Sequence, residues 1–207
     1  KAIDSMLLER AKKYGFYNHL AHIYIYSFDN NVDKYTQLDK IEEKLSGFNR
    51  GIELGKQIGN EQLLIEAYKK NIMIASTNGN FDVADFFYEK IYEVVKDTDN
   101  LAEQASICNG WGYNCCTAEK YEEANRYYNQ ALEIFSKMQN LIAVSETLYN
   151  MAVNAFMAED YEISDSYLAV CLRIVSSIKS NSVPVCNITK IFGLRAYCNY
   201  ELGKIYN

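Results

Sequence analysis

Few residues of the sequence have the types and spacing that catalysis or metal binding requires. His19 and His22 stand three residues apart in a helical pattern and could present two ring nitrogens to a metal ion, but the pattern places no third ligand beside them. Cys115 and Cys116 are adjacent, and adjacent helical side chains point about 100° apart, without the geometry of a CxxC redox pair. The sequence contains no glycine-rich phosphate loop, nucleophile elbow or metalloprotease helix. We therefore predict no catalytic residue, no metal ligand and no cofactor.

The composition favours a helical chain without a basic surface. The 207 residues carry a net charge of −6 and include ten glycines and one proline, which leaves few of the turn signals that closely spaced strands need. Basic residues are scattered among acidic ones, as in "DKIEEKLSGFNR", so we expect no direct nucleic-acid contact by this segment. No apolar run approaches the roughly 18 to 20 residues of a membrane span, so no membrane partner is expected.

The cysteines indicate a reducing compartment. Six cysteines lie inside apolar helical pattern, at Cys108, Cys115, Cys116, Cys171, Cys186 and Cys198. A chain of this size can build its core without a disulfide framework, so we predict buried, reduced thiols and a cytoplasmic location.

The sequence repeats with a step of forty residues. Similar segments begin at Phe81 ("FDVADFFYEKI"), Tyr121 ("YEEANRYYNQAL") and Tyr161 ("YEISDSYLAVCL"). Polar turns that hold Asn60, Asn100 and Asn140 keep the same step. One period therefore holds two helices and two turns, a pattern typical of an α-solenoid.

The repeat predicts a series of helix pairs. After a helix that ends near Tyr14, the expected helices cover residues 17–30, 35–57, 61–78, 81–97, 101–117, 121–138, 141–157, 161–178 and 185–203. Pro184 fits the first turn of the last helix, where its missing N–H costs nothing. We predict one repeat domain over residues 1–207, with units at 15–58, 59–98, 99–138 and 139–180 and a partial unit at 181–207.

The residues inside each unit resemble the tetratricopeptide repeat (TPR) family. The third unit carries the family's mixture of large and small residues at Cys108, Trp111, Gly112 and Cys115 on its first helix, and at Ala124, Tyr128 and Ala131 on its second. The resemblance implies an all-α fold, a right-handed α-solenoid of antiparallel helix pairs with four to five repeats. The repeats of this sequence differ from the usual TPR pattern in two ways: the step is forty rather than about 34 residues, and no unit has a closing proline. A TPR form with a forty-residue step is similar to that found in bacterial regulatory proteins and peptide-binding scaffolds.

Small residues mark where helices of a pair should cross closely. Such residues are Gly112, Ala152 and Ala196 on first helices, and Ala84, Ala124 and Ser164 on second helices. A long side chain at any of these positions would push the two backbones apart. Tyr121 and Tyr128 are expected to fill the space between units.

The resemblance also implies a binding groove lined by the first helices. Its expected residues are His22, Glu66, Lys69, Met73, Ser106, Asn109, Tyr113, Glu146, Tyr149, Asn150, Val153, Tyr197 and Tyr200. This mixture of aromatic and hydrogen-bonding side chains suits a peptide or protein ligand. Lys69 is the one clear base in the set, beside the acidic Glu66 and Glu146, so the set does not predict a carboxylate clamp.

Three functions follow as hypotheses. The first is a peptide- or protein-binding sensor or regulatory region of a bacterial signalling or transcription-regulating protein. Because the sequence opens inside a helix pattern and closes on a first helix without a polar cap, we expect it to be part of a longer protein with a DNA-binding or diguanylate cyclase output domain. The second is a free-standing interaction scaffold or a homo-oligomer that forms through terminal helices. The third, an enzyme, has no residue constellation to support it.

Overall fold

The computed structural model describes residues 9, 49–178 and 185–205, and all regular structure in these residues is helical. The chain divides between Asp97 and Thr98 into two compact blocks, which are called here the N-terminal block (Lys1–Asp97) and the C-terminal block (Thr98–Asn207). The expected helix at 17–30, most of the expected helix at 35–57, and the positions of His19, His22 and Pro184 lie outside the described residues.

The described part of the N-terminal block contains helical residues 49–58 followed by an antiparallel helix pair. This pair consists of α4 (Glu61–Thr77) and α5 (Phe81–Val95). Ala84 of α5 is fully buried, and so are Leu63 of α4 and Ile91 of α5. The turn between the helices contains Gly79 at a φ of +75°, a left-handed conformation that glycine adopts without strain.

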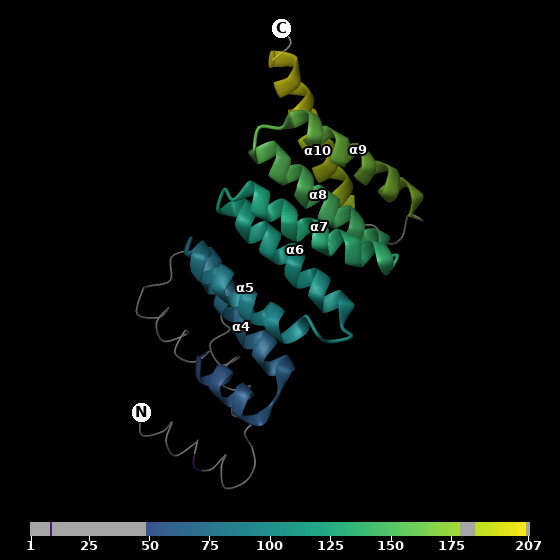
Figure 1. Cartoon of the computed structure of the whole chain (residues 1–207). Helices are drawn as coiled ribbons and strands as arrows, with labels where there is room; N and C mark the ends of the chain where they lie inside the picture. Colours follow the sequence, from purple (N-terminus) through teal and green to yellow (C-terminus); the bar gives the residue numbers. More distant parts are fainter. Residues whose placement is uncertain (1–8, 10–48, 179–184, 206–207) are drawn as a thin grey trace. The chain divides into compact units, whose positions relative to one another are not determined.

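The C-terminal block contains the five helices α6 to α10 (Figure 1). They are α6 (Leu101–Thr117), α7 (Tyr121–Lys137), α8 (Leu141–Met157), α9 (Tyr161–Ser177) and α10 (Val185–Ile205). Each helix packs mainly on the helices before and after it in sequence, as in a solenoid. The expected ranges 101–117 and 141–157 agree with α6 and α8, and the ends of the other helices in this block agree within two residues.

Polar side chains start the helices where the sequence predicts turns. The side-chain oxygen of Asn100 accepts a hydrogen bond from the Glu103 backbone N–H, and Asn140 does the same for Ala143. These bonds satisfy amide groups that the first turn of a helix leaves without a partner. The asparagines of the repeat are therefore N-caps, which explains why they keep the same step as the helices.

Small residues allow the close crossings within each helix pair. Gly112 of α6 and Ala152 of α8 are buried, and Ala124 and Ser164 are fully buried on the second helices α7 and α9. The Ser164 hydroxyl also donates a hydrogen bond of 2.8 Å to the Ala152 carbonyl oxygen, which joins α9 to α8.

One expectation about packing is wrong. Ala196 of α10 is exposed, because no described helix of the C-terminal block lies across it as α9 lies across Ala152. The expectation that Tyr121 and Tyr128 fill the space between units stays a prediction. Tyr128 lies against Gly112 of its own helix pair, because the absent side chain of that glycine leaves room for the ring.

Candidate functional site

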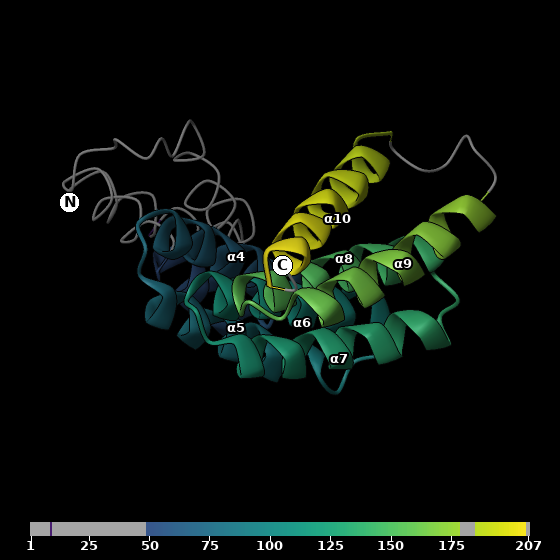
Figure 2. The same ribbon diagram turned by 90° about the horizontal axis from the view of Figure 1, so that it is seen from above.

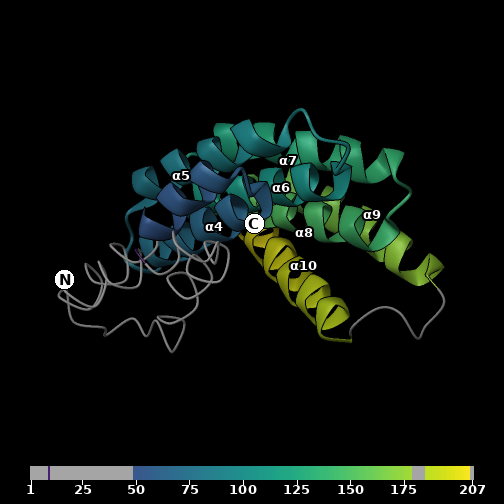
Figure 3. The same ribbon diagram turned by 90° about the horizontal axis from the view of Figure 1, so that it is seen from below.

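The first helices of the C-terminal block form one side of a cavity. The cavity has a volume of about 250 Å³ and is lined by Asn109, Ser145, Glu146, Tyr149, Asn150, Val175, Lys190 and Ile191. These residues come from α6, α8, the end of α9 and the start of α10. The cavity therefore depends on how α10 is held against the preceding helices, which Figures 2 and 3 show from two sides.

Two asparagines connect α6 and α8 at the cavity. The Asn150 side-chain Nδ2 donates a hydrogen bond of 3.2 Å to Asn109 Oδ1. Both side chains are half-buried, and neither Asn109 Nδ2 nor Asn150 Oδ1 has a partner among the described residues. The pair thus offers one amide donor and one amide acceptor to a bound molecule, the same combination that a peptide group requires.

Two side chains of opposite charge stand at the cavity. Glu146 belongs to α8 and Lys190 to α10, and both side chains are exposed. Within the described residues no ion pair joins Glu146 to Lys190, so each charge is available to a ligand. Tyr149 adds a half-buried ring, and burial raises the pKa of its hydroxyl, which therefore stays neutral at physiological pH.

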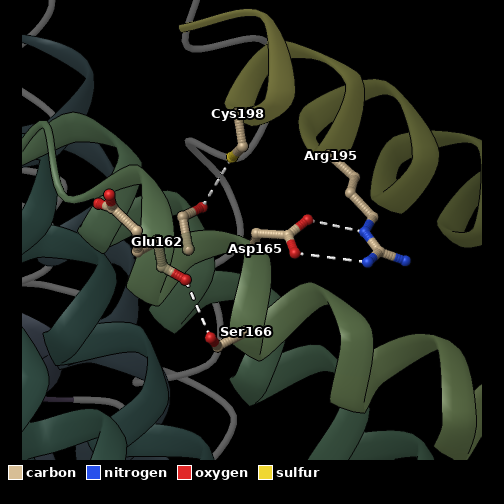
Figure 4. A network of polar contacts seen from close by, with 6 residues as sticks. Glu162, Asp165, Ser166, Arg195 and Cys198 are labelled. Carbon is tan, nitrogen blue, oxygen red and sulfur yellow. Dashed lines mark hydrogen bonds and ion pairs between the residues drawn. The ribbon is translucent and has the colours of Figure 1, made fainter. Parts of the chain in front are cut away.

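Polar contacts join α9 to the second half of α10 (Figure 4). Arg195 Nε donates a hydrogen bond of 2.7 Å to Asp165 Oδ1, and Arg195 Nη2 lies 3.4 Å from Asp165 Oδ2. The Cys198 thiol donates a hydrogen bond of 3.3 Å to the Ser164 hydroxyl oxygen. The carboxylate of Asp165 raises the pKa of Arg195 through this hydrogen bond and through its charge. Since Arg195 lies on the same helix as Lys190 and Ile191, these contacts help to fix that wall of the cavity.

Solved structures identify the fold, although no protein-family model and no curated protein sequence matches this chain. BtubC (BKLC) from P. vanneervenii has a TM-score of 0.64 at 15% sequence identity, over 91% of this chain and 82% of that chain. Nearly identical TPR-like repeats described as a kinesin light chain of Podosopora anserina have a TM-score of 0.65 at 11% identity, over 91% of this chain and 94% of that chain. The fold is TPR-like. The prediction of an all-α solenoid of helix pairs is thereby confirmed, and at these identities the likeness concerns the fold alone.

The structure of this TPR-like chain brings together four of the residues that the sequence places in a groove. These four are Asn109, Glu146, Tyr149 and Asn150. Their role in binding stays a prediction.

Other expected groove residues lie outside the cavity. Ser106 and Tyr113 are exposed on α6, and Val153 is half-buried on α8. On α10, Tyr200 is exposed, and Tyr197 makes an edge-on contact with Phe156 at 6.5 Å between ring centroids. Glu66, Lys69 and Met73 belong to α4 of the N-terminal block, and His22 lies outside the described residues.

Sequence reasoning missed half of the cavity lining, namely Ser145, Val175, Lys190 and Ile191. A usable signal was present for Lys190. The small residues Ala152 and Ala196 are 44 residues apart, and the same step from Glu146 leads to Lys190. Because four extra residues precede α10, a search with a strict period of forty residues does not align Lys190 with Glu146.

The described residues show no arrangement suited to metal chemistry or membrane crossing. Among the side chains that the structure describes, no group of three His, Cys, Asp or Glu residues is placed to hold a metal ion. None of the described helices is both long and apolar enough to span a membrane. The five cysteines whose side chains are described are buried thiols, as the sequence predicts.

Proposed function

We propose that the C-terminal block is a non-enzymatic module that binds a peptide segment of a partner protein at the cavity between α6, α8 and α10. The observation that carries this proposal is the pair of Asn109 and Asn150, whose remaining amide donor and acceptor face no partner among the described residues. A peptide group can bond to both atoms at once, because it carries one N–H and one C=O.

The neighbouring side chains would give such a ligand an orientation. Tyr149 supplies aromatic contact area, while Glu146 and Lys190 present opposite charges from different helices. Aromatic residues contribute contact area at binding sites, and complementary charges contribute specificity more than affinity. The site would therefore prefer a ligand that places a basic group near Glu146 and an acidic group near Lys190 over a ligand with these two charges exchanged.

The biological setting of this binding rests on the repeat pattern alone. The forty-residue step supports a role as the sensor or regulatory region of a bacterial signalling or transcription-regulating protein in the cytoplasm. The alternative, an interaction scaffold or oligomerisation element, is favoured by a different observation, the exposed aromatic side chains of α10.

A selection from a library of random short peptides tests the proposal. The purified chain serves as bait, and the Kd of a selected peptide is then measured for the wild type and for Asn109→Ala and Asn150→Ala. Loss of one ligand hydrogen bond should weaken binding by about tenfold, which corresponds to about 1.4 kcal/mol.

Asn129→Ala is the matched control, because Asn129 is exposed on α7 and does not line the cavity. This variant should bind like the wild type. Two results would contradict peptide binding at the cavity. One is that the selected peptides bind all three variants equally, and the other is that the library yields no binder.

A further inference from the structure

The remaining amide atoms of Asn109 and Asn150 set a direction for a bound peptide. Asn109 belongs to α6 and offers its Nδ2 as a donor, while Asn150 belongs to α8 and offers its Oδ1 as an acceptor. In an extended chain the N–H and the C=O of one residue point to the same side, and the N–H comes first along the chain. A peptide residue bound to both atoms therefore places its N–H over α8 and its C=O over α6.

The part of the peptide before this residue leads towards α10. Helix α8 contacts both α6 and α10, so a chain that leaves α8 in the direction away from α6 next reaches α10. On that side the cavity is lined by Lys190 and Ile191. The peptide residues before the bound one therefore lie near Lys190, and the residues after it continue over α6.

Gly193 leaves room for the peptide to cross α10. The step of 44 residues that leads from Glu146 to Lys190 also leads from Tyr149 to Gly193. This glycine therefore holds on α10 the place that the half-buried ring of Tyr149 holds on α8. Gly193 is exposed, and nothing lies within 4 Å of a Cβ atom built there. A peptide backbone can thus approach α10 closely beside Lys190.

The charges of Lys190 and Glu146 meet such a peptide one after the other. Lys190 belongs to α10, which the peptide crosses first, and Glu146 belongs to α8, one helical turn before Asn150. Both side chains are exposed. Neighbouring helix axes lie about 8–10 Å apart and an extended chain advances about 3.3 Å per residue, so the two contacts are about three peptide residues apart.

We propose that the cavity selects peptides in which an acidic residue stands about three positions before a basic residue, with the acidic side chain at Lys190 and the basic side chain at Glu146. This inference rests on the proposed function and adds the direction and the sequence preference of the ligand. A peptide with the opposite order of charges meets a like charge at both residues. If it binds in the reverse direction instead, its N–H and C=O no longer match the two asparagines.

Two libraries of short synthetic peptides test the order of charges. One has a fixed Asp-X-X-Lys segment and the other a fixed Lys-X-X-Asp segment, with random uncharged residues elsewhere, so both have the same net charge. The Kd of the strongest binders from each library is measured with the purified 207-residue chain by fluorescence anisotropy. The Asp-X-X-Lys binders should have a Kd about fivefold to tenfold lower, because attraction replaces repulsion at two exposed charges. Added salt should reduce this difference.

A variant that exchanges the two charges gives the sharpest comparison. Glu146→Lys combined with Lys190→Glu should reverse the preference and favour Lys-X-X-Asp by a similar factor, because the asparagines and the direction of the peptide are unchanged. Both residues are exposed, so the thermal melting of this variant should stay near that of the wild type.

A bulky residue on α10 tests the path of the peptide. Gly193→Tyr should weaken the binding of Asp-X-X-Lys peptides by at least about tenfold, because a ring would fill the open space beside Lys190. Asn199→Tyr is the matched control, since Asn199 is exposed on the same helix and does not line the cavity. This control should bind like the wild type.

The outcomes separate this inference from the proposed function. Equal binding of the two libraries, a wild-type preference for Lys-X-X-Asp, or a preference that the charge exchange does not reverse would each overturn the proposed direction. Binding that still requires Asn109 and Asn150 would in these cases uphold peptide binding at the cavity. Equal binding by the wild type and Gly193→Tyr would overturn the path over α10. If neither library yields a binder, peptide binding at the cavity is wrong, and this inference is wrong with it.

Discussion

The ring of Tyr128 on α7 occupies the space that a side chain on Gly112 of α6 would need. A Cβ atom at Gly112 would lie 2.7 Å from Cδ1 and Cε1 of that ring, and both residues are buried. The tyrosine is 1% exposed and is the largest of the fully buried side chains in the part of the chain that the structure describes. The contact therefore fixes the distance between α6 and α7 at their crossing.

Gly112→Ala should destabilise the protein although alanine favours helix more than glycine does. The added methyl group must displace the Tyr128 ring or separate α6 from α7, which should lower the free energy of unfolding by about 1–3 kcal/mol. Urea denaturation followed by circular dichroism measures the change. Gly193→Ala is the control, because nothing lies within 4 Å of a Cβ atom there, and it should stabilise α10 by about 0.5–1 kcal/mol. Equal effects of the two substitutions would contradict close packing at Gly112.

Local signals explain why the sequence predicts so much of this fold. The asparagine caps and the spacing of small residues depend on contacts within one helix pair, and both repeat along the chain. Ala196 shows the limit of such signals. It occupies the same place on its helix as Ala152, but burial at that place requires a second helix across it.

The cavity was only half predictable for a related reason. Asn109 and Asn150 follow from the repeat because they lie on neighbouring first helices of the array. A step of 44 residues from Glu146 leads to Lys190, but the place of Lys190 at the cavity also depends on how the contact of Arg195 with Asp165 holds α10. Such a contact joins residues 30 positions apart, and no periodic pattern encodes it.

Asn154→Asp should destabilise the C-terminal block strongly at neutral pH. Asn154 is fully buried, and its Nδ2 donates to the Tyr121 carbonyl oxygen at 3.0 Å and to Asn125 Oδ1 at 3.1 Å. A carboxylate would face two acceptors without water, so the loss should be on the order of 3 kcal/mol.

The loss caused by Asn154→Asp should depend on pH. The new carboxyl group would have a folded-state pKa above its unfolded value of about 3.9, so the penalty should shrink as the pH falls towards 4. Chemical denaturation at several pH values tests this. Asn129→Asp, on the exposed side of α7, should show neither effect. A pH-independent loss would show that the charge is not the cause.

Asp165→Asn should loosen α10 without unfolding the rest of the C-terminal block. The substitution removes the charge that Arg195 Nε contacts at 2.7 Å, a pair that is partly exposed and so contributes about 0.2–1 kcal/mol. Hydrogen exchange should become up to about fivefold faster in α10 and stay unchanged in α6. Added salt should reduce the difference from the wild type.

Glu133→Gln is the control for this ion pair. It breaks the exposed pair with Lys137 inside α7, at 2.6 Å, and should leave exchange in α10 unchanged. If both substitutions speed exchange in α10 equally, the contact between α9 and α10 is not what positions that helix.

The buried thiol of Cys171 should make the protein less stable as the solution becomes alkaline. Burial raises the pKa of this thiol from its ordinary value of 9.0 to about 12. Between these values the unfolded chain releases a proton that the folded chain keeps, so the unfolded state gains free energy of ionisation and the free energy of unfolding falls with rising pH. Below pH 9 both states hold the proton and the effect disappears.

The change with pH can be assigned to Cys171 by comparing the wild type with Cys171→Ala. Other thiols, tyrosines and lysines also titrate above pH 9, and Cys108 has its own pKa raised to about 11 by burial. These groups are common to both proteins, so the difference between their unfolding free energies isolates the one thiol. Urea denaturation from pH 8 to 10.5 should show a shallower decline for Cys171→Ala. Parallel declines would mean that the Cys171 thiol ionises as readily in the folded protein as in the unfolded chain, which its complete burial beside the Ser145 carbonyl oxygen argues against.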